Sequence, residues 1–252
     1  MPEIIPIDKA KADFAALLNS RKSDLARALP AVGVTPERLL RAVFTAATRQ
    51  PDLYLCTPQS VYRSVMLAAS AGLMPDGITG QAYLLPYNNK GVKECQLQLG
   101  VEGMRVLARR SGEVKAIGQQ VVREGDDFRF EYGTNKFLRH VPKPDNRGTI
   151  LAFYSVAEFT GGGTDFEVMW KGEVDLVRSR SRAKDSGPWV TDYEEMGKKT
   201  VTRRLCKRLP KSEEMARLLD ADARSTDGMP QHDDVPIPVA VEVKGENAEV
   251  AK

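Results

Sequence analysis

The densest group of chemistry-bearing side chains lies in residues 178–211, which include eleven Lys or Arg and four Asp or Glu. This stretch therefore carries a net charge of +7, whereas the whole chain of 252 residues carries +3. A positive charge concentrated in one part of a nearly neutral chain indicates a binding site for a polyanion, and nucleic acid is the leading candidate.

Six of these cations fall within a predicted helix over residues 193–209. On that helix Val201, Leu205 and Leu209 lie on one line that can pack against the core, and the cations occupy a wide arc that faces outward. Helix surfaces usually interleave acids among such cations, but no acid occurs between 198 and 211. The pattern therefore predicts phosphate binding rather than a merely solvated face. The candidate phosphate ligands are Lys198, Lys199, Arg203, Arg204, Lys207 and Arg208.

Four further cations recur at every second position just upstream. They are Arg178, Arg180, Arg182 and Lys184. If they end a helix, their side chains point in several directions, and if they form a loop, they can line a groove. Trp189 follows Gly187-Pro188 and can stack on a base. A Trp in that context more often anchors a loop to the core.

The elements that position these cations are first of all helices. Residues 8–29 have helical spacing of apolar side chains, as do residues 101–111. Two further helices are predicted to begin at Thr35-Pro36 and at Thr57-Pro58, because a hydroxyl cap followed by proline is a typical helix start.

Strand-like segments separate these helices from the basic region. Residues 81–87 and 92–99 flank Asn88-Asn89-Lys90-Gly91, which is a strong hairpin turn signal. Short strand-like runs follow at 114–122, 128–132, 150–159 and 166–170. The order of segments predicts an α+β fold, with a short antiparallel sheet and a β-hairpin packed against helices. Lys90 and Lys93, near Tyr87, form a second candidate surface, although Lys is common on edge hairpins.

Catalytic and metal-binding motifs are scarce in this chain. The three cysteines lie far apart and the two histidines are near no plausible nucleophile, so neither a metal site nor a cofactor is predicted. A phosphate-binding loop is rejected because Asp192 stands where its first glycine is needed. Asp76, with Glu113 and Lys115, imitates a metal-dependent nuclease pattern, and a DNA nuclease is therefore kept as the alternative from the enzyme class.

Composition divides the chain into three parts. Residues 1–34 are expected to form an N-terminal helical arm that contacts other protomers, and residues 35–211 to form the core. Residues 212–252 contain ten acids and four bases and few large apolar side chains, so an acidic, disordered tail is expected. No apolar run of about 18 residues predicts a membrane span. Since the chain also lacks a secretory signal at its N-terminus, a cytoplasmic protein is expected.

Several segments of the core also carry a family resemblance. The chain resembles the RecT-type single-strand annealing recombinases of phages and prophages over about residues 72–212. Gly197 stands where this resemblance leads us to expect Ala, a change expected to loosen the basic helix slightly. The matching segments are 80–86, 103–112, 124–133, 166–169, and the block from Ser186-Gly187-Pro188-Trp189 through 198–201 and 203–205 to Leu209-Pro210.

The resemblance implies a protein that binds single-stranded DNA and pairs complementary strands without ATP. Such proteins assemble as rings or helical filaments, act on single strands and the annealed duplex, and often work beside an exonuclease and a host single-strand-binding protein in the bacterial cell. It also implies DNA in a basic groove, with Lys198, Lys199, Arg203, Arg204 and Lys207 on the helix that grips phosphate, and with the Lys90 hairpin near the strand.

Two consequences can be stated from the sequence. The helices of residues 8–48 are expected to help make protomer contacts. Replacing Arg203 and Lys207 by Glu is expected to abolish strand binding and to leave the thermal melt unchanged. Besides annealing, two readings stay open: the nuclease, and a passive coat that binds single strands without pairing them.

Overall fold

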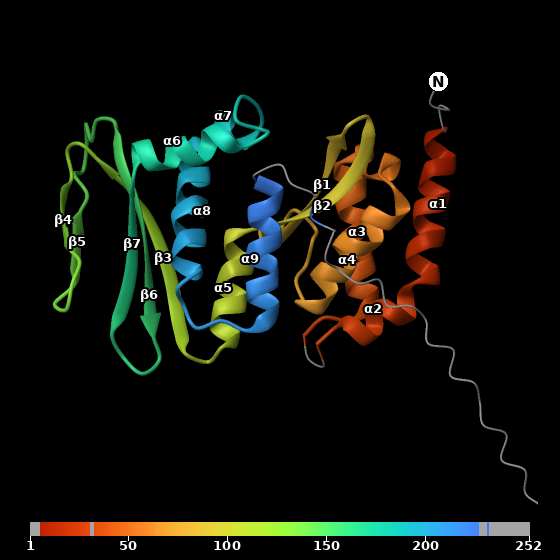
Figure 1. Cartoon of the computed structure of the whole chain (residues 1–252), viewed down its shortest axis with the longest axis horizontal. Coiled ribbons are helices and arrows are strands. Elements are labelled where there is room, and N and C mark those ends of the chain that lie inside the picture. Colours follow the sequence, from red (N-terminus) through yellow and green to blue (C-terminus); the bar gives the residue numbers. More distant parts are fainter. Residues whose placement is uncertain (1–5, 31–32, 227–230, 232–252) are drawn as a thin grey trace, which may run out of the picture.

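Two halves joined by two helices make up the architecture of the computed structural model, which describes residues 6–30, 33–226 and 231 (Figure 1). The helical half contains α1 (Ile7–Ser20), α2 (Lys22–Ala28), α3 (Pro36–Arg49), η1 (Pro51–Leu55), α4 (Pro58–Ser70), β1 (Ala82–Asn89) and β2 (Val92–Leu99). The sheet half contains β3 (Val114–Arg123), β4 (Asp127–Glu131), β5 (Phe137–Val141), β6 (Ile150–Phe159), β7 (Thr164–Trp170), α6 (Lys171–Arg180), α7 (Pro188–Thr191) and α8 (Tyr193–Cys206). Helices α5 (Val101–Arg110) and α9 (Glu213–Thr226) lie between the halves. The predicted α+β class, with small antiparallel sheets, is confirmed.

The two Thr-Pro helix starts are confirmed at α3 and α4. The Thr35 Oγ1 accepts the backbone N–H of Arg38 at 3.3 Å, and the Thr57 Oγ1 accepts that of Ser60 at 3.4 Å. Each hydroxyl satisfies one of the N–H groups that a helix start leaves without a partner. The helical run predicted over residues 8–29 is present as two helices, because the chain turns at Arg21 between α1 and α2.

The N-terminal helices belong to the main hydrophobic core of the helical half. Leu18 of α1 and Leu25 of α2 are fully buried in the same cluster as Leu39, Val43 and Val65 of α3 and α4. Residues 7–28 are therefore packed against the body of the protein. Protomer contacts through these helices stay a prediction.

The β1–β2 hairpin has the predicted turn. Lys90 and Gly91 both have positive φ, +51° and +89°, as a two-residue hairpin loop with right-handed twist requires. Alternate strand positions face opposite ways, so Leu84 is buried against the helical core while Tyr83 and Leu85 are half-buried on the other face. The hairpin therefore gives one face to the core and one to the space in front of it.

The outer edge of β2 is covered by side chains from other elements. Its backbone groups bond Ser60 and Ser64 at Cys95, Gln231 at Leu97, and Asp222 at Leu99. An open strand edge exposes unpaired N–H and C=O groups, and here side chains of α4, of α9 and of Gln231 satisfy them. Helix α9 thereby becomes part of the hairpin's support.

The expectation of a disordered acidic tail that begins at residue 212 is wrong for residues 213–226. These residues form α9, whose Met215, Leu218 and Leu219 are buried in the main core. The apolar residues recur at helical spacing, which the net negative charge of the segment concealed. Residues 227–230 and 232–252 of the predicted tail lie outside the described residues.

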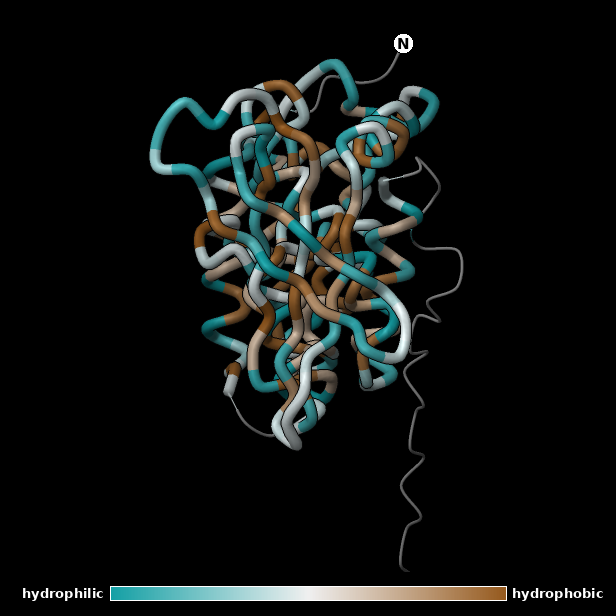
Figure 2. The backbone as a smooth tube through the Cα atoms, turned by 90° about the vertical axis from the view of Figure 1, so that its left-hand side faces the viewer, coloured by the Kyte–Doolittle hydropathy of each residue, from teal (hydrophilic) through white to brown (hydrophobic). Residues whose placement is uncertain are grey.

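The sheet half is layered around the antiparallel sheet β3–β6–β7. Helix α8 packs on one face of this sheet, and the β4–β5 hairpin packs on the other. Seen from the side of that hairpin, hydrophilic and hydrophobic positions alternate along the strands nearest the viewer (Figure 2). Strands β3, β4, β6 and β7 are predicted by the sequence pattern, whereas β5, which is five residues long, is not.

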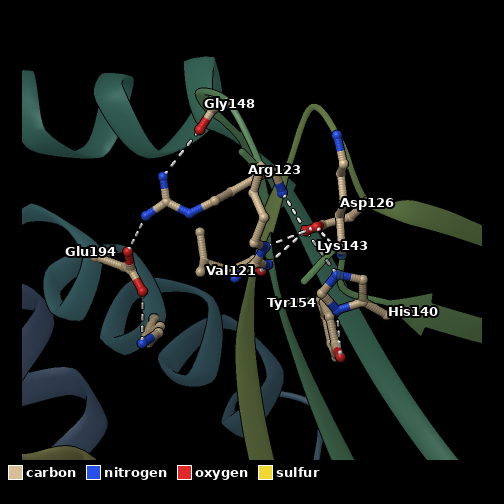
Figure 3. A network of polar contacts seen from close by, with 10 residues as sticks. Val121, Arg123, Asp126, His140, Lys143, Gly148, Tyr154 and Glu194 are labelled. Carbon is tan, nitrogen blue, oxygen red and sulfur yellow. Dashed lines mark hydrogen bonds and ion pairs between the residues drawn. The ribbon is translucent and has the colours of Figure 1, made fainter. Parts of the chain in front are cut away.

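A buried carboxylate ties the base of the β4–β5 hairpin together (Figure 3). The Asp126 side chain is fully buried and accepts hydrogen bonds from Arg147 at 2.6 and 2.8 Å, while its Oδ2 lies 3.1 Å from Nε2 of His140. The Arg147 hydrogen bonds outweigh burial and hold the pKa of Asp126 well below its usual range. Arg123, in the same network, pairs with Glu194 at 2.7 Å and so connects it to α8.

Candidate nucleic-acid interface

A cleft separates the free face of the β1–β2 hairpin from α7 and the first half of α8. Two adjoining hollows form it, of about 140 Å³ and about 430 Å³. Both are lined by Leu85, Gln98, Pro188, Met196 and Lys199, so they make one continuous depression. We call it the hairpin cleft.

The walls of the hairpin cleft are largely apolar and aromatic. Tyr83, Leu85 and Tyr87 contribute from β1, because residues at i, i+2 and i+4 of a strand share one face. Pro188 and Met196 face them from α7 and α8. Such walls suit flat nucleobases, which stack on aromatic rings without regard to sequence.

Three cations line the narrower hollow, namely Arg182, Lys199 and Arg203. Lys199 and Arg203 are nearly buried, with 13% and 14% of their side chains exposed. Asp222 of α9 lies 3.4 Å from the Lys199 Nζ and 3.0 Å from an Arg203 Nη, and is itself 1% exposed. The two cations and one carboxylate leave a net positive charge at this end of the cleft.

Burial and charge act against each other in this group. Burial lowers the pKa of Lys199 despite the neighbouring Asp222. Burial alone would raise the pKa of Asp222, but the charges of Lys199 and Arg203 outweigh it and leave that pKa below its usual range.

Acids outnumber cations in the lining of the wider hollow, where Lys199 is the cation. Glu102, Asp192 and Glu195 face it, and two of them have cationic neighbours outside it, Arg105 for Glu102 and Lys198 for Glu195. The hairpin cleft is therefore polarised, with cations toward Arg182 and carboxylates toward Glu102.

The predicted outward arc of free cations is only partly present. Arg204, Lys207 and Arg208 are exposed as predicted, whereas Lys198, Lys199 and Arg203 are largely buried, and all of these except Lys207 have acidic partners. Besides the Asp222 group, Arg204 and Arg208 reach Glu167 of β7 at 2.8 and 2.9 Å, and that carboxylate is 6% exposed. Lys198 is 17% exposed and pairs with Glu194 and Glu195 at 3.1 and 2.9 Å. Acids of α9 and β7 therefore compensate Lys199, Arg203, Arg204 and Arg208, and acids in the first turn of α8 compensate Lys198. Lys207 is exposed, just after the helix.

The cations of residues 178–184 divide between a helix and a loop. Helix α6 ends at Arg180, and Arg182 and Lys184 belong to the segment that leads to α7. Arg178 lies over the ring of Tyr193, 5.9 Å from its centroid, and its Nε donates to the carbonyl of Lys184. Arg180, Arg182 and Lys184 are exposed, and Arg182 also lines the cleft.

Trp189 is only 3% exposed and packs with Val174 and Val201 in the core of the sheet half. The interpretation of this Trp as a loop anchor is confirmed. By holding α7 in place, it fixes Pro188 at the wall of the cleft.

The hairpin lysines separate in the structure. Lys90 stands exposed at the tip, whereas Lys93 pairs with Asp52 of η1 at 2.9 Å. Tyr87 faces the cleft near Arg182 and Ser225, and burial raises its pKa.

A site residue that the sequence analysis missed is Arg49. With Tyr83 and Leu85 it lines a third hollow of about 270 Å³, which therefore adjoins the hairpin cleft. The signal was available, because α3 has three arginines and no acid after Glu37.

The residues of the nuclease pattern give that alternative no support. The Asp76 Oδ1 accepts the N–H groups of Ile78 and Thr79 at 2.8 and 2.9 Å and so closes its own turn. Lys115 lies 3.7 Å from Glu158 on the neighbouring strand. Within the described ranges, no three His, Cys, Asp or Glu side chains gather as a metal site.

None of the helices in the same ranges is long and apolar enough to cross a bilayer.

Comparison with known proteins shows the family of the chain. The model of the RecT family matches residues 37–238, which include every residue named above for the hairpin cleft. The chain belongs to the RecT family. It is 41% identical to Protein RecT of Escherichia coli (strain K12) over 225 residues, which cover 87% of this chain and 83% of that protein. It is also 25% identical over 199 residues to the uncharacterized protein YqaK of Bacillus subtilis (strain 168), covering 79% of this chain and 68% of the relative.

The extent of the RecT match bears on the domain boundaries. It runs past residue 211, where the sequence analysis had ended the core, and includes the whole of α9. The helix that supports the hairpin and pairs with Lys199 therefore lies within the region that the family model matches. RecT proteins are DNA-binding recombination proteins, which fits a cleft with aromatic walls and a cationic end.

Proposed function

We propose that this RecT-family protein binds single-stranded DNA in the hairpin cleft and anneals complementary strands without ATP. The observation that carries the proposal is the cleft itself, with apolar and aromatic walls along its length and cations at one end. The family match supports the same class of activity.

The polarity of the cleft orients the strand. Phosphates are repelled by Glu102, Asp192 and Glu195, so the sugar-phosphate chain follows the cationic end. Arg182 lies there, with the exposed Arg180 and Lys184 beside it and Lys90 on the hairpin tip. Bases then lie against the aromatic and apolar walls. Phosphate contacts and stacking carry little sequence information, so binding is sequence-tolerant.

Lys199 and Arg203 act mainly from the floor of the cleft. Their charges are shared with Asp222, so they contribute potential and shape more than direct, fully exposed contacts. Lys198, Arg204, Arg208 and Lys93 serve ion pairs outside the lining of the cleft.

Annealing needs no bond chemistry. Two strands repel each other through their phosphates, and protein cations that neutralise one strand lower this repulsion and release counterions. One cleft covers only a few nucleotides, so several protomers on one strand supply affinity through multivalency, as a ring or filament. The substrates are single strands and the annealed duplex. An exonuclease that produces single strands and a host single-strand-binding protein are the proposed partners in the bacterial cytoplasm.

An annealing assay tests this proposal. Complementary labelled oligonucleotides are mixed with the protein in the absence of nucleotide and added metal, and pairing is followed by energy transfer. The cleft variant replaces Arg180, Arg182 and Lys184 by Gln. Its matched control replaces Lys115, Arg129 and Arg139 by Gln, which removes the same charge from side chains 68%, 72% and 65% exposed on β3 and the β4–β5 hairpin.

We expect fast pairing with wild type and control, and slow pairing with the cleft variant. The cleft variant should also flatten the salt dependence of binding by about 2 in the slope of log K against log salt, since each lost phosphate contact removes about 0.7. Cleaved strands would indicate the nuclease, and protection without pairing would indicate a passive coat. Either outcome contradicts annealing.

A further inference from the structure

Helix α3 presents a row of arginines, most of which lie outside the hairpin cleft. We propose that Arg38, Arg41 and Arg49 form a second track for polynucleotide phosphates, continuous with the hairpin cleft. This inference rests on the proposed function, because it extends the path of the bound DNA beyond the cleft. We call these three side chains the α3 arginine face.

Helical geometry places the three side chains together. At 100° per residue, positions 38, 41 and 49 fall within an arc of about 80°. All three are exposed, while Leu39 and Val43 on the opposite side are fully buried. The helix therefore gives one face to the core and this one to the surroundings.

Unlike the cations of α8, these arginines form no ion pair among the described residues. Asp76 lines the hollow of Arg49, but its Oδ1 accepts the N–H groups of Ile78 and Thr79. Within the described parts of the chain, none of the three pairs with a carboxylate, and Arg38 donates only a long hydrogen bond of 3.4 Å to the Gly33 carbonyl. The nearest acids along the chain are already engaged. Glu37 pairs with Lys22 at 2.8 Å, and Asp52 pairs with Lys93 at 2.9 Å.

Helix stability does not explain the positions of all three. Arg49 lies in the last turn, where a cation suits the helix dipole. Arg38 lies in the first turn, where the positive end of the dipole disfavours a cation. A bound anion removes this penalty and the mutual repulsion of the row.

The α3 arginine face joins the cleft through Arg49. Arg49 shares the third hollow with Tyr83 and Leu85, and both of these side chains also line the hairpin cleft. Positions 38 and 49 lie about 16 Å apart along the helix axis at about 1.5 Å per residue. Since a strand carries one phosphate per about 3.4 Å, the row matches on the order of three to five phosphates.

Salt-dependent binding tests the α3 arginine face. The variant replaces Arg38, Arg41 and Arg49 by Gln, and the control is the Lys115, Arg129 and Arg139 triple. Affinity for a fluorescent single-stranded oligonucleotide is measured by anisotropy over a range of salt. The α3 variant is expected to keep the wild-type melt and to lose about 2 from the salt slope, at about 0.7 per phosphate, whereas the control keeps the slope.

A dye near the row gives a second readout. The native thiols are buried, and burial raises the pKa of Cys56 and Cys206 to about 12, so a new surface thiol labels selectively. Thr48 is exposed beside the arginines, and a dye at Thr48→Cys should change its emission when DNA binds. The same change should be lost when the three arginines are Gln.

The outcomes separate this inference from the proposed function. If the wild-type protein binds single-stranded DNA without salt dependence, the proposed function itself is wrong. A salt-dependent wild type with an α3 variant that matches the control overturns only the α3 track. An α3 variant that binds DNA normally but no longer self-associates in sedimentation shows a protein contact instead, and this also overturns it.

Discussion

Helices α8 and α3 have similar sequences in one respect, but their cations have different surroundings in the structure. Each carries several cations in a row with no acid among them. The cations of α8 meet Asp222, Glu167 and Glu194, which come from other elements or from its own first turn. The arginines of α3 meet no carboxylate among the described residues.

This difference shows that a run of cationic residues in a sequence does not by itself predict a binding surface. The fold decides which acids lie near a given cation. An ion pair with a buried carboxylate such as Asp222 is stronger than an exposed one, because solvent screens it less. Among the α8 cations, Lys199 and Arg203 line the cleft, and Lys198 and Arg204 form ion pairs outside it. The arginines of α3 form no ion pair among the described residues, and we propose them as ligands for phosphate.

The largest expected effect separates Arg203 from Lys207. Arg203→Glu removes a buried ion pair and places a carboxylate beside Asp222, so the free energy of unfolding should fall by more than about 4 kcal/mol. Lys207→Glu, at an exposed position, should stay within about 0.5 kcal/mol. Urea denaturation measures both. The earlier expectation of an unchanged melt for the double variant is thereby replaced, and equal effects of the two changes would break the comparison.

The next effect concerns the network that holds α8 from the other side. Asp126→Asn leaves the Arg147 guanidinium without its buried partner and should cost about 3 kcal/mol. Hydrogen exchange should rise in β4, β5 and the first turn of α8, with α3 unaffected. Faster exchange in α3 as well would contradict the separation of the two halves.

The same variant predicts a pH dependence. Because the folded-state pKa of Asp126 lies below that of the unfolded chain, its contribution is fully present above about pH 4 and is lost as pH falls toward the folded-state pKa. The stability difference between wild type and Asp126→Asn should therefore shrink as the solution is acidified below pH 4. A constant difference would assign the effect to packing.

A smaller effect tests how closely α8 lies on the sheet. A Cβ at Gly197 would collide with the fully buried ring of Phe153, so Gly197→Ala should cost about 1–3 kcal/mol through overpacking. The higher helix propensity of Ala would stabilise the folded state by only about 1 kcal/mol. A rise in melting temperature would show that Phe153 can move. The glycine thus permits close packing, which corrects the expectation that it merely loosens the helix.

The smallest change in stability is expected on α3. Arg41→Ala should alter the free energy of unfolding by no more than about 0.5 kcal/mol while it lowers the salt slope of DNA binding by about 0.7. Thermal melts and anisotropy titrations measure the two quantities. A large stability loss would show that Arg41 is structural, as the α8 cations are.

Local patterns predicted the elements well and the site less well. Thr35-Pro36, Thr57-Pro58 and the Asn-Asn-Lys-Gly turn determine their own neighbourhoods, so the helices and the hairpin followed from short-range chemistry. The ion pairs of Arg203 with Asp222 and of Arg204 with Glu167 join residues 19 and 37 positions apart, and no periodicity encodes them. The cleft required the hairpin and α8 to meet, which only the tertiary structure provides.

Photocrosslinking gives the most direct test of the hairpin cleft as the DNA site. A single-stranded oligonucleotide that carries iodouracil is irradiated with the protein, and the modified peptides are identified by mass spectrometry. Adducts on Tyr83 and Tyr87, which line the cleft, are the predicted result. Adducts confined to Tyr132 and Trp170, each 50% exposed on the sheet half, would contradict the account.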